Sequence, residues 1–248
     1  INGEMYDRLR SLGRVAEGIS PAVFDDPVAL QALLEQRSIL TPLFNGGAFV
    51  ARIDGTAIAS IPTSVGRVGV NYMDRDFIVA ALKEGKSTIG KPIMGKKMQS
   101  PLIVIGTPIR DTQGNVIGAL AGVIDLGEAN FLNRITNNTY GKTGGYLLVA
   151  PQYRLIVTAS DHTRILQPLP VSGVNAVTDR HLVGYEGTDV YIDANGVEVL
   201  ASAKSVPVAG WYVTVTLPTE EAFASIRKLQ KSMLLATIFL TLLAAILT

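Results

Sequence analysis

The sequence predicts an α+β fold in which a long N-terminal helix is followed by two antiparallel-sheet domains in tandem and a C-terminal transmembrane helix. Three observations lead to this prediction. Pairs of short, apolar, β-branched-rich segments flank turn residues, apolar residues recur at helical spacing in the first part of the chain, and no charged residue occurs from Ser232 to Thr248. Because strands joined by hairpins pair antiparallel, a Rossmann or parallel-barrel fold is excluded.

The composition limits the possible classes of protein. The 248 residues suffice for one large or two small domains, and the hydrophobic fraction of 48% suffices for a real core. A formal net charge of +1 argues against a nucleic-acid binder, which would carry a concentrated basic field. The absence of Cys excludes disulfide scaffolds and Cys-based zinc sites, and the two His lack metal-ligand spacing. We therefore expect no metal, no cofactor and no nucleic-acid partner.

Residues 1–44 are expected to form N-terminal stalk helices. Apolar residues recur at helical spacing over residues 1–19, and this stripe is also a candidate homodimer interface. Asp25 or Asp26 can cap a second helix over residues 28–40. Since the chain begins without Met, we expect it to be a piece of a longer protein.

Residues 45–126 are expected to form the first sheet domain. Asp54-Gly55 is a hairpin turn dipeptide, and Gly85 is suited to end a short helix. The expected elements are strands 48–53, 57–62, 101–110 and 116–126, with a helix over residues 74–84.

Residues 127–140 are expected to form a linker helix, centred on 127–138, and residues 141–218 a second sheet domain. The two domains read as copies of one unit, because residues 46–50 resemble residues 144–148 and each segment opens a hairpin. The expected strands of the second domain are 146–150, 155–159, 190–193, 197–206 and 211–217.

Residues 219–231 are expected to form a juxtamembrane helix with Thr219 as its cap, continuing into a transmembrane helix over residues 232–248. A helix that is apolar all round is either embedded in lipid or buried in a large core. A full span needs roughly 20 apolar residues, so the span would continue past Thr248. The basic residues just before the segment would make that end cytoplasmic, but the opposite flank is needed to decide the orientation.

Several segments are similar to double Cache sensor domains. They are Asn71-Tyr72-Met73-Asp74-Arg75-Asp76-Phe77, Ile89-Gly90-Lys91-Pro92, Gly122-Val123-Ile124-Asp125-Leu126, Gly141-Lys142-Thr143-Gly144-Gly145-Tyr146 and Gly210-Trp211-Tyr212-Val213. The resemblance covers roughly residues 16–223. It implies two PAS-like domains in the bacterial periplasm, anchored in the inner membrane, with the ligand in the membrane-distal domain and an empty membrane-proximal domain.

The expected ligand site lies in the first domain. Arg75 can grip a carboxylate through its planar fork, and Asp125, at the end of an apolar strand, can receive an ammonium group. Tyr72, Asp74, Phe77 and Thr107 complete the set of candidate ligand-binding residues. The alternative is that these residues have a purely structural role. Arg75 would then form an internal ion pair with Asp125 or Asp74, and Tyr72 and Phe77 would belong to the core.

Amino-acid-binding members of the resembled family use an Arg and a strand-end Asp at what look like the positions of Arg75 and Asp125. They also carry a Tyr, a Trp and a Tyr where this chain has Val70, Phe77 and Ile78. The expected small-molecule ligand is an amino acid, an amine or a carboxylate. These departures argue against the standard way in which the family binds an amino acid.

The predicted function is ligand sensing by the extracytoplasmic part of a bacterial transmembrane receptor. We do not expect an enzyme in this part of the protein, since the sequence has no nucleophile motif and no metal cluster. The resemblance points to a homodimer whose cytoplasmic output turns over cyclic-di-GMP, as in proteins with diguanylate cyclase or phosphodiesterase domains. The alternatives are a chemoreceptor, a histidine kinase sensor, and a ligand-free ectodomain that binds another protein.

Overall fold

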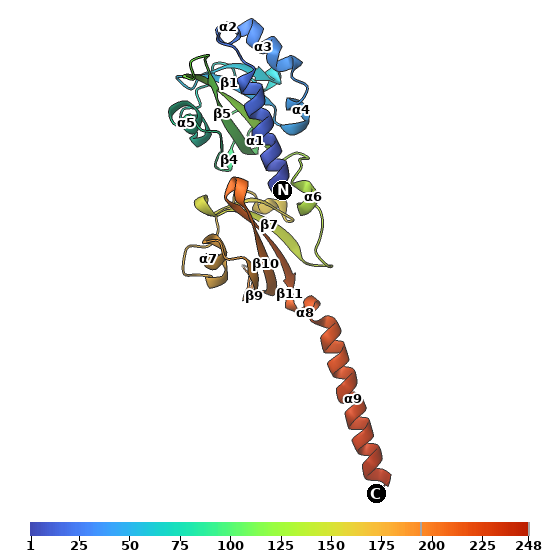
Figure 1. Cartoon of the computed structure of the whole chain (residues 1–248). Helices are drawn as coiled ribbons and strands as arrows, with labels where there is room; N and C mark the ends of the chain where they lie inside the picture. Colours follow the sequence, from blue (N-terminus) through green and yellow to red (C-terminus); the bar gives the residue numbers. More distant parts are fainter. Residues whose placement is uncertain (194, 248) are drawn as a thin grey trace.

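The computed structural model describes residues 1–193 and 195–247, without the side chains at 242, 243, 246 and 247. Two sheet domains follow one another along the molecule, and a long helix projects from the second domain to the C-terminus (Figure 1). The α+β class and the tandem antiparallel sheets predicted from the sequence are confirmed.

The N-terminal region consists of helices α1 (Asn2–Glu17), α2 (Pro21–Phe24), α3 (Pro27–Gln36) and α4 (Leu40–Leu43). Asp26 caps α3, because its Oδ1 accepts hydrogen bonds from the backbone N–H groups of Val28 and Ala29 at 2.9 and 3.2 Å. The predicted second helix therefore begins as expected. It ends earlier than predicted, at Gln36, and α4 begins separately at Leu40.

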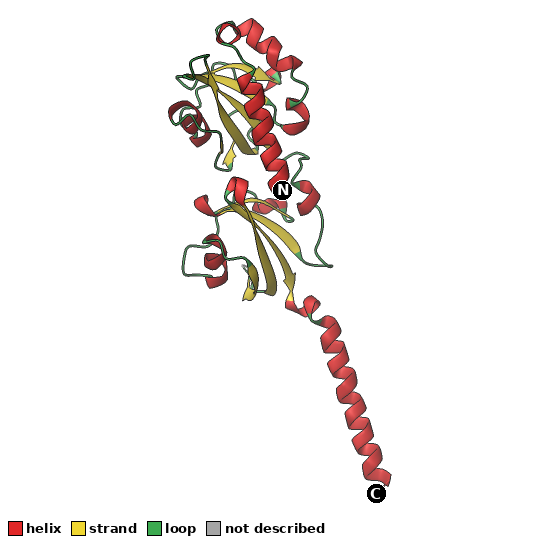
Figure 2. Ribbon diagram, viewed as in Figure 1, coloured by secondary structure: helices red, strands yellow, loops and turns green. Residues whose placement is uncertain are grey.

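The first sheet has the strand order β2-β1-β6-β5-β3, with β4 paired to β5, and all its pairings are antiparallel. Helix α1 packs on one face through β5 and β6, and helix α5 packs against the same two strands from the other side (Figure 2). The elements are β1 (Ala48–Arg52), β2 (Ala57–Ile61), α5 (Asp76–Lys83), β3 (Thr88–Ile89), β4 (Ile93–Met94), β5 (Pro101–Arg110) and β6 (Val116–Asp125).

The predicted linker helix over residues 127–138 is wrong, since the only helix in this segment of the described chain is the four-residue α6 (Asn133–Thr136). Asn130 gives the physical reason. Its side-chain amide donates to the carbonyl of Glu128, and its side-chain oxygen accepts from the backbone N–H of Leu132. Side-chain hydrogen bonds of this kind compete with helical backbone bonds and favour a turn.

The second sheet has the strand order β8-β7-β11-β10-β9, again antiparallel throughout. Helix α7 lies beside it (Figure 1). The elements are β7 (Gly145–Ala150), β8 (Leu155–Ala159), α7 (Ala176–Leu182), β9 (Gly187–Ile192), β10 (Glu198–Val206) and β11 (Trp211–Pro218). Short 3₁₀ turns occupy Thr63–Val65, Pro151–Tyr153, His162–Arg164 and Pro207–Ala209.

Helix α1 connects the two domains. Its buried residues Met5 and Leu12 belong to one apolar cluster that continues through the first sheet to Trp211 of the second. The Asn2 side-chain oxygen also accepts a hydrogen bond from the backbone N–H of Val208, at 3.0 Å, in the turn before β11. The apolar stripe predicted as a dimer interface is thus buried inside the chain. The sequence could not distinguish these two uses of one apolar face.

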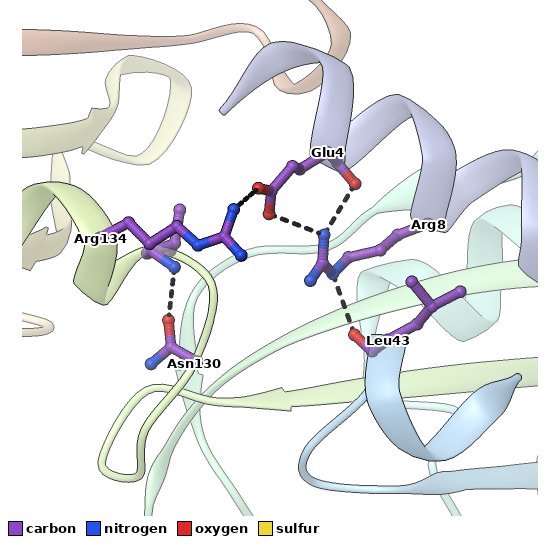
Figure 3. Close-up of polar contacts among 6 residues, drawn as sticks. Glu4, Arg8, Leu43, Asn130 and Arg134 are labelled. Carbon is purple, nitrogen blue, oxygen red and sulfur yellow. Dashed lines mark hydrogen bonds and ion pairs between the residues drawn. The ribbon is translucent and has the colours of Figure 1, made fainter.

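A charged cluster fixes the junction where α1 meets the segment between the domains (Figure 3). The Arg8 guanidinium lies 3.6 Å from the centre of the Phe131 ring and donates to the carbonyl of Leu43 at 2.9 Å. Glu4 accepts from both Arg8 and Arg134, at 3.3 and 3.1 Å. These contacts join α1, α4 and α6 into one corner of the molecule.

The C-terminal region consists of α8 (Thr219–Ala222) and α9 (Ala224–Leu247). Thr219 does not cap the helix as predicted, because its hydroxyl lies 2.6 Å from the Glu198 carboxylate and ties α8 to β10. Over residues 224–241, α9 is exposed, so the alternative of a terminal helix buried in the core is wrong.

The transmembrane helix predicted at 232–248 is not found. Among the residues whose side chains are described, no helix is both long and apolar enough to cross a membrane. Part of the predicted span, at residues 242, 243 and 246–248, lies outside the described side chains.

Candidate ligand-binding site

The candidate site is a pocket in the first domain, on the face of the sheet that carries α5. It is closed by the connection between β4 and β5, and its free volume is about 20 Å³. This is roughly the space of one water molecule, well below the range for small-molecule sites, so a ligand would have to displace side chains of the β4–β5 connection to enter.

The floor of the pocket is apolar because side chains alternate along each strand. Leu102 and Val104 of β5 and Val123 of β6 face the pocket, whereas Ile103 and Ile105 face α1. The ring of Phe49 from β1 lies against the Tyr72 ring, with centroids 4.6 Å apart. A ligand would therefore contact an apolar surface that excludes water. In such surroundings, hydrogen bonds between the protein and charged groups of the ligand are strong.

Arg67 is the most informative residue of the pocket. Its side chain is buried, with 3% exposed, and it donates to the carbonyls of Gly46 and Ile61, to Ser60 Oγ and to Met98 Sδ at 2.5–3.3 Å. All these acceptors are neutral, and no carboxylate of the described residues pairs with it. Burial lowers the pKa of Arg67, although an arginine remains charged in proteins. A buried cation without an anion is costly, so this position favours an anionic ligand.

Arg75 and Lys96 form the mouth of the pocket and share one carboxylate. Asp74 Oδ2 lies 3.5 Å from Arg75 Nε, and Asp74 Oδ1 lies 2.6 Å from Lys96 Nζ. Partial burial would raise the pKa of Asp74, but the hydrogen bond from Lys96 and the charge of Arg75 outweigh it and hold the pKa below its ordinary value. Asp74 is therefore ionised, and it neutralises one of two neighbouring cations.

Tyr72 supplies a hydroxyl group to the same pocket. Burial raises the pKa of Tyr72, and the nearby positive charge of Arg67 only partly offsets this effect. The phenol therefore keeps its proton and can donate a hydrogen bond to a ligand. Lys96 Nζ also lies 5.3 Å from the centre of the Tyr72 ring, which holds the β4–β5 connection over the pocket.

The structure brings three of the six predicted residues together at the pocket wall. Tyr72, Arg75 and Phe77 line it, and Asp74 lies at the rim. Of the two alternatives for an Arg75 ion pair, the pair with Asp74 is present.

Thr107 and Asp125 do not line the pocket. Thr107 lies on the face of β5 that is turned to α1, and its hydroxyl bonds Ser87 at 2.6 Å. Asp125 follows Val123 on the pocket-facing side of β6, but its Oδ1 accepts from Ser100 Oγ and from the backbone N–H of Gly127. The expected ammonium acceptor is thus already engaged within the chain.

Sequence reasoning missed Arg67. It lies in a turn between β2 and α5, close to Gly66 and Gly69, which both have positive φ. Neither helical nor strand periodicity extends through this segment, so no pattern in the sequence indicates that the side chain points inward.

Comparison with known proteins identifies one family. The family model described as Cache domain matches residues 1–226. Among curated proteins, no sequence matches the chain.

Solved structures with the same fold include ligand-binding domains of chemoreceptors. That of the amino acid chemoreceptor PctB of Pseudomonas aeruginosa PAO1, in complex with L-Arg, has 22% sequence identity and a TM-score of 0.68, covering 90% of this chain and 91% of its own. The chemoreceptor CtaA of Pseudomonas fluorescens, with L-serine, has 18% identity and a TM-score of 0.64, covering 88% and 91%. PctC of Pseudomonas aeruginosa PAO1, with GABA, has 17% identity and a TM-score of 0.63, covering 87% and 92%. At these identities the likeness concerns the fold.

Proposed function

The chain belongs to the Cache domain family, and from this premise we propose that it is the ligand-sensing part of a bacterial transmembrane receptor that binds a small carboxylate in the pocket of its first domain. The observation that carries the proposal is Arg67, a buried cation on the pocket wall whose only partners among the described residues are neutral. A ligand carboxylate would supply the missing anion. It would also replace the weak acceptor Met98 Sδ by a charge-assisted hydrogen bond.

The relatives support a carboxylate as the recognised group. The printed ligands of PctB, CtaA and PctC are L-Arg, L-serine and GABA, and each of these molecules carries a carboxylate. In this chain the carboxylate would lie between Arg67 and Arg75, with the Tyr72 hydroxyl as a further donor.

The proposal extends to the location and the output of the receptor. The domain lies in the periplasm at the inner membrane and works as a homodimer. Exposed apolar side chains on α9, among them Leu234, Leu235 and Phe239, support an association of this helix with the membrane. Ligand binding would favour one of two packings of the domains. This change would be transmitted to a cytoplasmic output, either a chemotaxis signal or cyclic-di-GMP turnover.

The test is calorimetric titration of the whole chain in mild detergent with L-serine, L-arginine, GABA and butyrate, each beside its amide. We expect binding of one or more carboxylates and none of the matching amides. At one hundred times its dissociation constant, a bound ligand should also raise the free energy of unfolding by about 2.7 kcal/mol.

Arg67→Met should weaken binding about 10- to 100-fold, because charge-assisted hydrogen bonds contribute about 1.5–3 kcal/mol. Arg52→Met is the matched control, since Arg52 is exposed at the end of β1 in the same domain. Equal binding of carboxylates and amides would contradict the proposal. No binding at all would favour the ligand-free ectodomain that contacts another protein.

A further inference from the structure

We infer that a cavity at the junction of the two domains is a second binding site, for a small monocarboxylate with an apolar body. This junction cavity lies beside the charged cluster of α1 and α6 and has a free volume of about 380 Å³. Such a volume is within the range for small-molecule sites. The cavity is on the opposite face of β6 from the pocket of the first domain, because Ile124 lines the cavity and Val123 lines the pocket.

Arg8 presents a free donor group to the junction cavity. The residue is buried, with 7% exposed, and two of its three guanidinium nitrogens are bonded within the chain. Nε donates to the Leu43 carbonyl, and Nη1 donates to the backbone and the side chain of Glu4. Nη2 donates to none of the described residues, and it is not shielded from solvent. A guanidinium held in place with one open nitrogen is suited to bind an oxyanion.

Arg134 approaches the same Glu4 carboxylate from the other side. Its Nη1 lies 3.1 Å from Glu4 Oε1, whereas Arg8 Nη1 lies 3.3 Å from Glu4 Oε2. In Figure 3 the free ends of the two guanidinium groups point toward one another below this carboxylate. A ligand carboxylate between them would accept charge-assisted hydrogen bonds from both arginines.

The charges that line the junction cavity leave one positive charge uncompensated. Among the lining residues that the structure describes, Arg8 and Arg134 are basic and Glu4 is acidic. Asp7 also attracts Arg8, but Asp7 is exposed on α1 and does not line the cavity. Because Glu4 neutralises one of the two guanidinium groups, a ligand with a single negative charge completes the balance.

The other lining residues favour an apolar body for the ligand. Asn45 and Asn130 line the cavity, but their side-chain amides are already bonded to backbone groups of residues 125–132. Recognition of the charge therefore depends on the two arginines, and apolar side chains contact the rest of the ligand. These apolar residues are Pro42, Leu43, Ile124, Ala129 and Phe131.

The experiment is calorimetric titration of the whole chain in mild detergent with benzoate, benzamide and acetate at constant ionic strength. Benzamide has the ring of benzoate without the charge, and acetate has the charge without the ring. We expect benzoate to bind about tenfold more tightly than either, because the charge-assisted hydrogen bonds and the apolar contacts both contribute. Equal affinities for benzoate and benzamide, or for benzoate and acetate, would overturn the inference.

Arg134→Gln should weaken benzoate binding about three- to fivefold. The substitution should leave stability unchanged, since 81% of the Arg134 side chain is exposed. Arg10→Gln, at an exposed position of α1, removes the same charge and is the matched control, which should bind benzoate like the wild type. Arg67→Met, which removes the buried cation of the first-domain pocket, should also leave benzoate binding unchanged.

These variants separate the inference from the proposed function. If Arg67→Met abolishes benzoate binding and Arg134→Gln does not, benzoate binds in the first-domain pocket, and the inference fails while the proposed carboxylate sensor remains. If benzoate does not bind at all, the junction site is absent, whichever ligands the first-domain pocket takes. If Arg10→Gln weakens benzoate as much as Arg134→Gln, binding reflects only the net charge of the chain and the inference fails.

Discussion

Two arginines are buried among the residues that the structure describes, and the chain compensates their charges differently. Arg8 has a carboxylate partner in Glu4 and a ring partner in Phe131. Arg67 has only neutral partners among the described residues. Since an unpaired buried charge is destabilising, Arg67 is the residue whose charge the proposed carboxylate would neutralise, whereas the charge of Arg8 is already compensated within the chain.

Arg8→Met should lower the free energy of unfolding by about 2–3 kcal/mol. The change removes the hydrogen bond to the Leu43 carbonyl and the stacking on Phe131, and it leaves a buried carbonyl unpaired. Urea unfolding monitored by circular dichroism measures the effect. Arg10→Met, at an exposed position of α1, should change stability by less than about 0.5 kcal/mol. Equal effects of the two substitutions would show that the junction contributes nothing specific.

Glu186 should make the stability of the second domain depend on pH in the acid range. Hydrogen bonds from Lys204 and Ser205 lower the pKa of Glu186 from 4.5 to about 2. A carboxyl group whose pKa is lowered by folding adds stability above its ordinary pKa, and this contribution is lost as the pH falls from about 4.5 to about 2.

The stability difference between the wild type and Glu186→Gln should therefore be largest above pH 5 and shrink towards pH 2. Thermal unfolding of both chains across this range measures it. Glu17→Gln, at an exposed position of α1, serves as the control for general acid effects. A difference that stays constant with pH would exclude the role of the Glu186 carboxylate.

At single residues, the sequence indicates which candidate residues lie close together only where they are near one another along the chain. Tyr72, Arg75 and Phe77 lie in one short segment that enters α5, and their common wall could be predicted from that segment alone. Asp125 lies away from the pocket, and its partner Ser100 lies 25 residues earlier in the sequence, just before β5. Such a contact is a product of the tertiary fold and leaves no pattern along the chain.

At the scale of elements, the contact between α5 and β5 positions the pocket. Gly106 of β5 lies directly under α5, where an added Cβ would lie 3.0 Å from the carbonyl carbon of Phe77 and still closer to its oxygen. Only a residue without a side chain lets the helix approach the strand this closely.

Gly106→Ala should lower the free energy of unfolding by about 1–3 kcal/mol, as expected for overpacking, and should weaken ligand binding as Phe77 shifts. Gly13→Ala is the matched control, because no atom lies within 4 Å of its added Cβ. In helix α1 that change should stabilise the protein by up to about 1 kcal/mol. Chemical unfolding and titration with the identified ligand test both; an unchanged Gly106→Ala protein would contradict the close packing.

The elements that the sequence predicted correctly are those with strong local signals. Hairpins were found because turn residues such as Asp54-Gly55 separate β-branched segments, and the start of α3 was found because Asp26 precedes Pro27. The linker was mispredicted because Asn130 forms side-chain hydrogen bonds to neighbouring backbone groups, which break the helix. The spacing of apolar residues does not show where a side chain will compete in this way with the hydrogen bonds of a helix.

At the scale of the whole molecule, α1 makes the two sheet domains depend on each other. Its apolar face is part of the cluster that reaches from the first sheet to Trp211 in the second. The chain contains one Trp, so its fluorescence reports on the second domain alone.

Leu12→Ala should destabilise the protein by about 2–5 kcal/mol, because Leu12 is fully buried. We expect the Trp211 fluorescence transition and the circular dichroism transition to coincide in the wild type and to move together in the variant. Val28→Ala, at an exposed position of α3, is the control. If Leu12→Ala does not shift the unfolding transition seen by Trp211 fluorescence, the two domains unfold independently.

The hydrogen bond between Asn2 and Val208 has a consequence for folding during translation. All strands of the first sheet have left the ribosome once Asp125 has emerged, so that sheet can close early. The start of α1 must wait for a partner made 206 residues later. Until then its apolar residues near the N-terminus, such as Met5, lack part of their final cover, and a chaperone that binds exposed apolar segments during translation would find its target there.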